Sequence, residues 1–106
     1  MSAYAVGHLE HVNMGQPIVD YLRNIDATLA EYGGRFIIHG GRTDVLEGSF
    51  RGDLIVIEFP DLARARAWYA SPAYREILPL RTENASGAVF LIEGVGPDHK
   101  ATDVLG

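Results

Sequence analysis

Cysteine is absent from this sequence of 106 residues, so no disulfide, thiolate nucleophile or thiolate metal ligand is available. Basic residues are scarce: 9 Lys and Arg stand against 14 Asp and Glu, which gives a formal net charge of −5. Proteins that bind nucleic acid need clustered positive charge along the phosphate backbone. We therefore expect no nucleic-acid partner.

Long hydrophobic runs are also missing. No apolar run approaches the ~20 residues that a membrane helix needs. The opening residues MSAYAVGHLEHV lack the charged and apolar regions of a signal peptide. We expect a cytoplasmic protein that does not bind membranes. The chain is 47% hydrophobic and 22% charged, which is typical of a folded chain, and its length predicts one domain over residues 1–106.

The hydrophobic pattern alternates between strand and helix. A helix is predicted from Pro17, which suits a first helical turn, to Gly33-Gly34, which end it. Its apolar face is expected to contain Ile18, Leu22, Ile25 and Leu29. Asp61 is a good N-cap for a helix over 62–70, and Pro79 is expected to interrupt a further helix over 73–85. Strands are predicted over 3–12, 35–39 with a continuation through 43–50, 54–59 and 88–94.

The order strand, helix, strand, strand, helix, strand predicts an α+β fold. Two split strand–helix–strand units with right-handed crossovers interleave into a four-stranded antiparallel sheet. Both helical segments then cover the same face of the sheet. This is the ferredoxin-like βαββαβ arrangement, and it leaves the other face uncovered.

The uncovered face is expected to be apolar. In LIVIEF, Ile55 and Ile57 alternate with Leu54 and Val56, so both faces of this strand contain apolar side chains. The chain is too short to supply another layer of helices. A second copy packed sheet against sheet is the economical cover, and we predict a homodimer.

The strings EYGGRFIIHGG, VLEG, VIEFPD and ARAWYASPAYREILPLR resemble a family of small bacterial proteins known as domain of unknown function 1330. The resemblance runs from about residue 4 to residue 94. It implies a dimeric α+β barrel and no established activity. Family members often carry arginine where this chain has His39. The wider superfamily includes cofactor-free monooxygenases, haem-degrading enzymes and lactone isomerases.

His39 interrupts an apolar strand, and alternation places it opposite Phe36 and Ile38. We expect Phe36 and Ile38 to pack under the helices and His39 to face the interior of the barrel. Glu58 and His8 share that face by the same count. If they meet, an imidazole and a carboxylate in an apolar space could move a proton, which makes His39 and Glu58 the catalytic candidates. The alternative is a buried polar pair with a structural role only.

Aromatic residues gather around the helix break at Ser71-Pro72. Tyr74 and Arg81 fall on one helical stripe, where they could form the polar rim of a pocket for an acidic or enolic ligand. The alternative is that Arg81 pairs with a surface acid. Trp68 is most simply part of the core. The candidate ligand-binding residues are Tyr74, Arg81, Tyr69 and His8.

His8 and His11 invite a metal interpretation, but on a regular strand they face opposite ways. We therefore expect no metal site, and no cofactor is implied. Three functions stay open: a cofactor-free enzyme acting by proton transfer on a small organic acid, phenol or lactone; a non-catalytic small-molecule binding module; and a purely structural dimer. An enclosed space of roughly 300 Å³ with His39, Glu58 or Arg81 on its wall would favour the first two.

Overall fold

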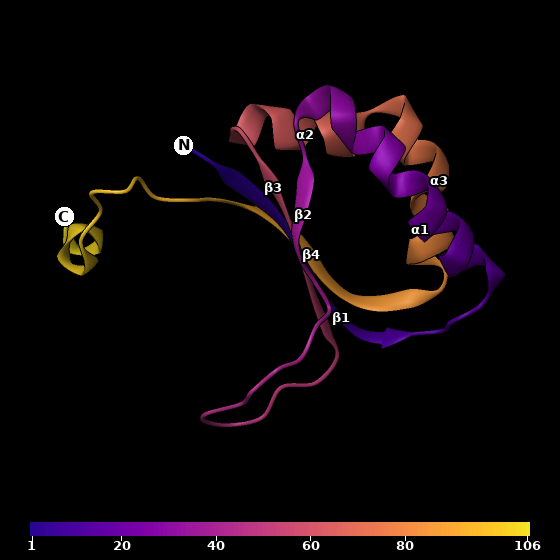
Figure 1. Ribbon diagram of the computed structural model, residues 1–106, viewed down its shortest axis with the longest axis horizontal. Helices are drawn as coiled ribbons and strands as arrows, with labels where there is room; N and C mark the ends of the chain where they lie inside the picture. Colours follow the sequence, from indigo (N-terminus) through magenta and orange to yellow (C-terminus); the bar gives the residue numbers. More distant parts are fainter.

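The computed structural model describes all 106 residues. The chain forms β1 (Ala3–Val12), α1 (Gln16–Leu29), η1 (Ala30–Tyr32), β2 (Arg35–His39), β3 (Asp53–Phe59), α2 (Leu62–Ala70), α3 (Pro72–Thr82), β4 (Ala85–Glu93) and η2 (Ala101–Leu105). The strands pair antiparallel in the order β2-β3-β1-β4, and the three α-helices lie on one side of the sheet (Figure 1). The expected ferredoxin-like α+β fold is confirmed. None of the helices combines the length and the hydrophobicity that spanning a membrane requires.

The buried face of α1 contains Tyr21 in place of the expected Leu22, and Thr28 in addition. Ile18, Tyr21, Ile25 and Leu29 are buried, whereas Leu22 is half exposed. Pro17 lies in the first turn as expected. Gly33 ends η1 with a φ of 71°, in the left-handed region that glycine adopts without steric cost.

Two side chains fix the helical segments that follow β3. Asp61 caps α2 by accepting a hydrogen bond from the Arg64 amide at 2.8 Å. Ser71 then joins α2 to α3, because its hydroxyl donates to the Trp68 carbonyl at 2.7 Å and accepts from the Tyr74 amide at 3.3 Å. Pro79 was expected to interrupt α3, but the helix continues past it to Thr82.

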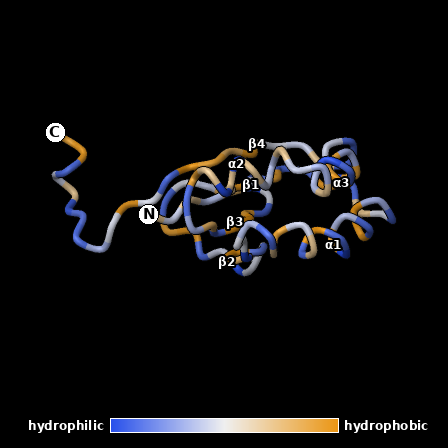
Figure 2. The backbone as a smooth tube through the Cα atoms, turned by 90° about the horizontal axis from the view of Figure 1, so that it is seen from above, coloured by the Kyte–Doolittle hydropathy of each residue, from blue (hydrophilic) through white to orange (hydrophobic).

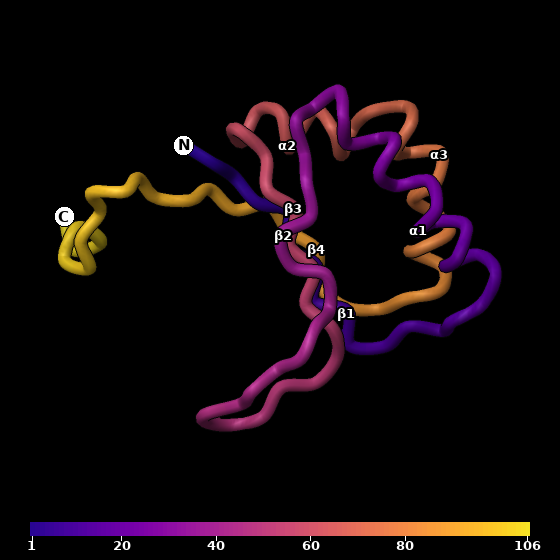
Figure 3. Tube along the Cα trace, viewed as in Figure 1, coloured from indigo at the N-terminus to yellow at the C-terminus, as the bar shows by residue number.

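The connection between β2 and β3 contradicts one prediction. Residues 43–50 were expected to extend the second strand, but residues 40–52 form a loop that projects beyond the sheet (Figure 3). Gly40 and Gly41 have φ values of 71° and 89°, which take the backbone out of the extended region at the end of β2. The loop exposes apolar side chains, among them Leu46 at 88%.

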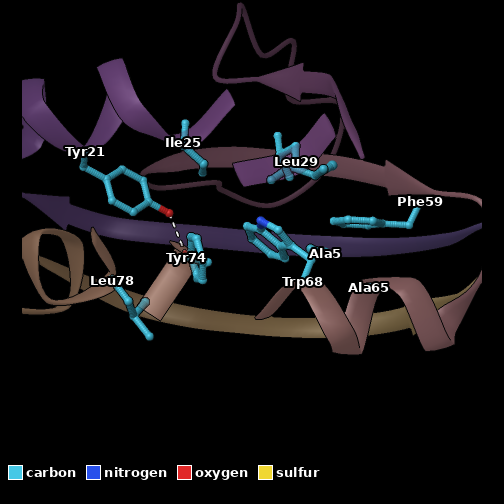
Figure 4. Packing of buried hydrophobic residues seen from close by; sticks show 10 residues of the cluster. Ala5, Tyr21, Ile25, Leu29, Phe59, Ala65, Trp68, Tyr74 and Leu78 are labelled. Atoms are coloured by element: carbon cyan, nitrogen blue, oxygen red, sulfur yellow. Dashed lines mark hydrogen bonds between the residues drawn. The ribbon is translucent and has the colours of Figure 1, made fainter. Parts of the chain in front are cut away.

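The core lies between the sheet and the helices. Phe59, Trp68 and Tyr74 meet there, with Tyr21, Ile25 and Leu29 of α1 on the opposite side (Figure 4). The Trp68 indole N–H donates to the Thr28 hydroxyl at 2.9 Å, which satisfies both buried polar groups. Trp68 is thus a core residue, as expected. In Figure 2 the helices alternate hydrophobic and hydrophilic residues, and the C-terminal segment is mixed, with hydrophobic residues at its end.

The other sheet face has no helix over it (Figure 1). Phe90 and Ile92 of β4 lie opposite Val6 and Tyr4 of β1, and they are 46% and 52% exposed. Loop 40–52 and the C-terminal segment extend on the side of the sheet away from the helices. The apolar character expected for the uncovered face is therefore present.

Candidate functional site

A cavity of about 110 Å³ lies between the sheet and the helices. Its wall is almost entirely apolar, with aliphatic and aromatic side chains from β1, β2, β3, β4, α1, α2 and α3. The polar and aromatic-hydroxyl side chains on the wall are His39, Tyr21, Tyr69, Tyr74 and Arg81. A concave apolar space with a few polar groups is the usual form of a small-molecule site.

Two tyrosine hydroxyls meet at this cavity. The Tyr21 and Tyr74 hydroxyl oxygens are 2.7 Å apart, and they join α1 to α3 (Figure 4). Tyr74 is only 1% exposed, and its ring packs on Trp68 with centroids 4.1 Å apart. The Arg81 guanidinium carbon lies 6.0 Å from the centre of the Tyr21 ring. The expected stripe of Tyr74, Leu78 and Arg81 thus reaches the same cavity through its first and last members.

The three groups at this end of the cavity influence one another's protonation. Burial, followed by the neighbouring Tyr74 hydroxyl, raises the pKa of Tyr21 well above its usual value of 10.0, and Arg81 opposes this only in part. Burial acts to lower the pKa of Arg81, but the Tyr74 and Tyr21 hydroxyls outweigh it and the pKa is raised. At neutral pH the Tyr21 hydroxyl therefore stays neutral, and Arg81 carries its positive charge beside it.

His39 lies on the cavity wall, on the face opposite to the one expected. Phe36 pairs with Ile57 and His39 with Ile55, while Ile38 pairs with Val56. The strand has an irregularity between Phe36 and Ile38, which adds one residue and reverses the alternation beyond it. His39 therefore lies on the same sheet face as Phe36, the one that faces the helices, with their rings stacked at 4.6 Å, but at the end of β2 it remains exposed. Ile38 faces the uncovered side.

Glu58 does not lie on the cavity wall, and the proposed pair with His39 is not formed. Its carboxylate is on the uncovered face, where it accepts bonds of 3.1 and 2.7 Å from the Arg35 side chain. The Tyr4 hydroxyl lies 3.5 Å from its other oxygen. Since Glu58 pairs with Arg35 and His39 with Ile55, the two candidate catalytic side chains lie on opposite faces of the sheet.

His8 also lies away from the cavity. Its Nε2 is 2.7 Å from the Arg51 carbonyl oxygen, and its ring stacks on Phe50 at 4.9 Å. The prediction that His8 and His11 face opposite ways is wrong, because an irregularity between Leu9 and His11 shifts the register. No group of three His, Asp or Glu side chains is arranged to hold a metal ion.

Tyr69 lies on the cavity wall beside Tyr74, with ring centroids 5.6 Å apart. The Arg75 guanidinium covers its ring at 5.2 Å. Tyr21 is the wall residue that the sequence reasoning missed. The signal was available, because Tyr21 is three residues after Ile18 and four before Ile25, the spacing of a buried helical face.

The antiparallel sheet order and the helices on one face define a ferredoxin-like α+β protein, with a partly open cavity between the two layers. The chain belongs to the family of the domain of unknown function DUF1330, whose model matches residues 2–95. The resemblance of the sequence strings to this family is thereby confirmed. A comparison with curated proteins finds no match.

Solved structures of similar fold come from several bacteria. RPA0582, a protein of unknown function from Rhodopseudomonas palustris, is 16% identical, with a TM-score of 0.67 over 91% of this chain and 84% of that chain. A dimeric ferredoxin-like protein of unknown function from Jannaschia sp. CCS1 is 22% identical, with a TM-score of 0.66 over 89% and 100%. SnoaB, a cofactor-independent oxygenase from Streptomyces nogalater, is 13% identical, with a TM-score of 0.53 over 93% and 96%. At these identities the similarity establishes the fold alone.

Proposed function

We propose that this protein binds a small organic acid or phenol in the cavity and transfers a proton to or from it without a cofactor. The observation that carries the proposal is the cavity itself, in which Arg81 and Tyr74 share an otherwise apolar wall. An apolar wall favours a compact carbon skeleton. The guanidinium is a fork of donors suited to a carboxylate or another anionic oxygen.

The size of the cavity limits the ligand. At about 110 Å³ it does not reach the roughly 300 Å³ that was expected to favour a small-molecule function, which is also the lower end of typical drug-sized sites. An engineered apolar cavity of about 150 Å³ in another protein holds benzene. A ligand enclosed here is therefore no larger than a compact ring or a short-chain acid, unless the mouth of the cavity opens further.

Proton transfer needs a group that exchanges a proton near neutral pH. Histidine is the side chain whose ordinary pKa suits that task. His39 is the only histidine on the wall, and it comes from the sheet, whereas Arg81 comes from the helical layer. We assign Arg81 and Tyr74 to holding the acidic end of the ligand, and His39 to exchanging the proton.

Chemistry without a cofactor is compatible with this fold. SnoaB, which is similar in fold at 13% identity, is a cofactor-independent oxygenase. Because one fold hosts many unrelated activities, this supports the possibility of such chemistry and says nothing about the reaction. The proposal rests on the residues of the cavity wall and not on the similarity to SnoaB.

The experiment is calorimetric titration with benzoate and with its neutral analogue benzamide. We expect benzoate to bind more tightly, and Arg81→Leu to remove the preference for the anion. Arg66→Leu, a matched change of an exposed arginine on α2, leaves the preference intact. If the parent binds neither compound, nor any of a series of small phenols and short-chain acids, the proposal fails and a structural dimer is the better account.

We also propose that the functional unit is a homodimer formed through the uncovered sheet face. Phe90 and Ile92 would leave water there, along with the apolar residues of the neighbouring strands. Loop 40–52 and the C-terminal segment would flank the partner copy, because both extend on that side of the sheet. The similar protein from Jannaschia sp. CCS1 is dimeric, which supports the same arrangement here.

A further inference from the structure

We infer that Tyr21 and Tyr74 act together as one hydrogen-bond donor which, beside Arg81, selects a ligand with an anionic oxygen such as a phenolate or an enolate. This inference rests on the proposed function, because it names the ligand chemistry that the cavity prefers. It assigns a binding role to Tyr21, which belongs to no motif in the sequence.

The two hydroxyls of the pair carry two protons, and only one of them can lie in the bond between them. The two hydroxyl oxygens are 2.7 Å apart, so one proton lies between them, and either residue can supply it. The hydroxyl that accepts this bond keeps its own proton. Neither Tyr21 nor Tyr74 makes a second side-chain hydrogen bond to a protein acceptor, so that proton has no partner in the chain.

Arg81 cannot accept the remaining proton, because a guanidinium has only donors. Arg81 and the hydroxyl pair are therefore donors that share one cavity wall. An oxygen that only accepts hydrogen bonds would satisfy them together. A neutral hydroxyl on the ligand would satisfy them less well, because it adds a further proton to the same cluster.

The protonation of Tyr21 agrees with this role. Burial and the Tyr74 hydroxyl raise the pKa of Tyr21, so Tyr21 keeps its proton at neutral and mildly alkaline pH. It can therefore donate to an anionic oxygen but cannot serve as a base. The apolar remainder of the wall suits a compact ring, and a phenolate combines the two requirements.

The test uses 4-nitrophenol at a pH where the free probe is mostly ionised, with nitrobenzene as the matched probe that lacks the hydroxyl. We expect the parent to bind nitrophenolate more tightly than nitrobenzene. Tyr21→Phe and Tyr74→Phe should each reduce this preference about tenfold or more, because a hydrogen bond to a charged group is lost. The double variant should lose more than either single one, because each single variant keeps one hydroxyl proton that can still reach the ligand.

Tyr32→Phe is the control, because Tyr32 is not on the cavity wall, and it should bind both probes as the parent does. A second measurement needs no variant: at a lower pH, where the free probe is only partly ionised, the absorbance of bound nitrophenol should report a larger ionised fraction than that of the free probe. Equal binding of both probes by the parent, or an unchanged preference in folded Tyr21→Phe, overturns the inference and leaves the proposed function standing. If neither probe binds the parent while benzoate does, the inference is also wrong.

Discussion

His39 combines a polar ring with a position on the wall of an apolar cavity. Arginine at this place would keep a hydrogen-bond donor, whereas leucine would remove it. We expect His39→Arg to keep the fold and ligand binding, and His39→Leu to keep the fold but weaken binding of a small acid by several-fold. His39→Arg should abolish any proton transfer that depends on the imidazole.

Thermal melts and ligand titration of both variants check this prediction, with His11→Leu as a matched change of an exposed histidine outside the cavity. If His39→Leu binds as well as the parent, the ring only fills space beside Phe36. If His39→Arg retains turnover, another group exchanges the proton.

Tyr21 should make the free energy of unfolding depend on pH in the alkaline range. Its pKa is raised above the usual 10.0, so the folded state holds the proton after the unfolded state has released it. The stabilisation is fully present below pH 10.0 and is lost as the pH rises toward the folded-state pKa. We expect the free energy of unfolding to fall above that pH, and to fall less steeply in Tyr21→Phe.

Urea unfolding of the parent and of Tyr21→Phe across this pH range measures the difference. Because other tyrosines contribute in this range, the comparison is between the slopes of the free energy of unfolding against pH and not between its absolute values. Tyr4→Phe serves as the control, because its hydroxyl is part of neither the pair nor the cavity wall. Identical slopes for the parent and Tyr21→Phe would contradict the prediction.

At the scale of elements, Ser71 holds the junction of α2 and α3, from which Tyr74 enters the cavity. Ser71→Ala removes the bond to the Trp68 carbonyl and the cap on the Tyr74 amide. We expect a loss of about 1–2 kcal/mol in the free energy of unfolding. Ligand affinity should fall as well, because the start of α3 positions Tyr74. Ser86→Ala, at an exposed position of β4, is the control in urea unfolding and should change neither quantity.

The strands show which parts of the site could be predicted from the sequence. Apolar runs such as LIVIEF, and Pro17 and Gly33 at the ends of a helix, depend on local chemistry, and they led to the correct fold. The face of His39 depends on the pairing of β2 with β3, and one extra residue in a strand reverses it. The irregularity in β1 between Leu9 and His11 likewise explains why the predicted orientation of His11 is wrong. Alternation is reliable only up to the first bulge.

The helices were easier to assign than their buried faces. Both Tyr21 and Leu22 fit the spacing of α1 with Ile18 and Ile25, and only packing against α3 decides that Tyr21 is the buried one. Tyr74 and Arg81 were predicted from a spacing within one helix, which tertiary contacts do not alter. The hydroxyl pair needed two elements to be placed together, so no local pattern could predict it.

At the scale of the whole molecule, the uncovered sheet face is expected to be the dimer interface. Val56 lies on this face but is only 9% exposed, so a charge there would damage the monomer itself. Phe90 is exposed and provides the cleaner test. We expect Phe90→Lys to shift the protein from dimer to folded monomer, because the lysine charge would be buried without a partner in the dimer.

Light scattering at micromolar concentration measures the mass, for which a monomer of 11.6 kDa is the reference. Met14→Lys is the matched control, because Met14 is exposed in the connection between β1 and α1, at the far end of the molecule from the uncovered face (Figure 1). A monomeric parent would contradict the proposed dimer. A dimeric Phe90→Lys variant would place the interface on another surface.

The central claim is that the ligand lies between the sheet and the helices, against Tyr74 and Arg81. The most direct measurement is NMR shift mapping of the parent titrated with benzoate, followed through backbone amides and the arginine side chains. We predict the largest shifts at Tyr74, Arg81 and Tyr21, with smaller ones at His39, and none at His8 or His11. Shifts confined to the uncovered face, or centred on His8 and loop 40–52, would contradict it.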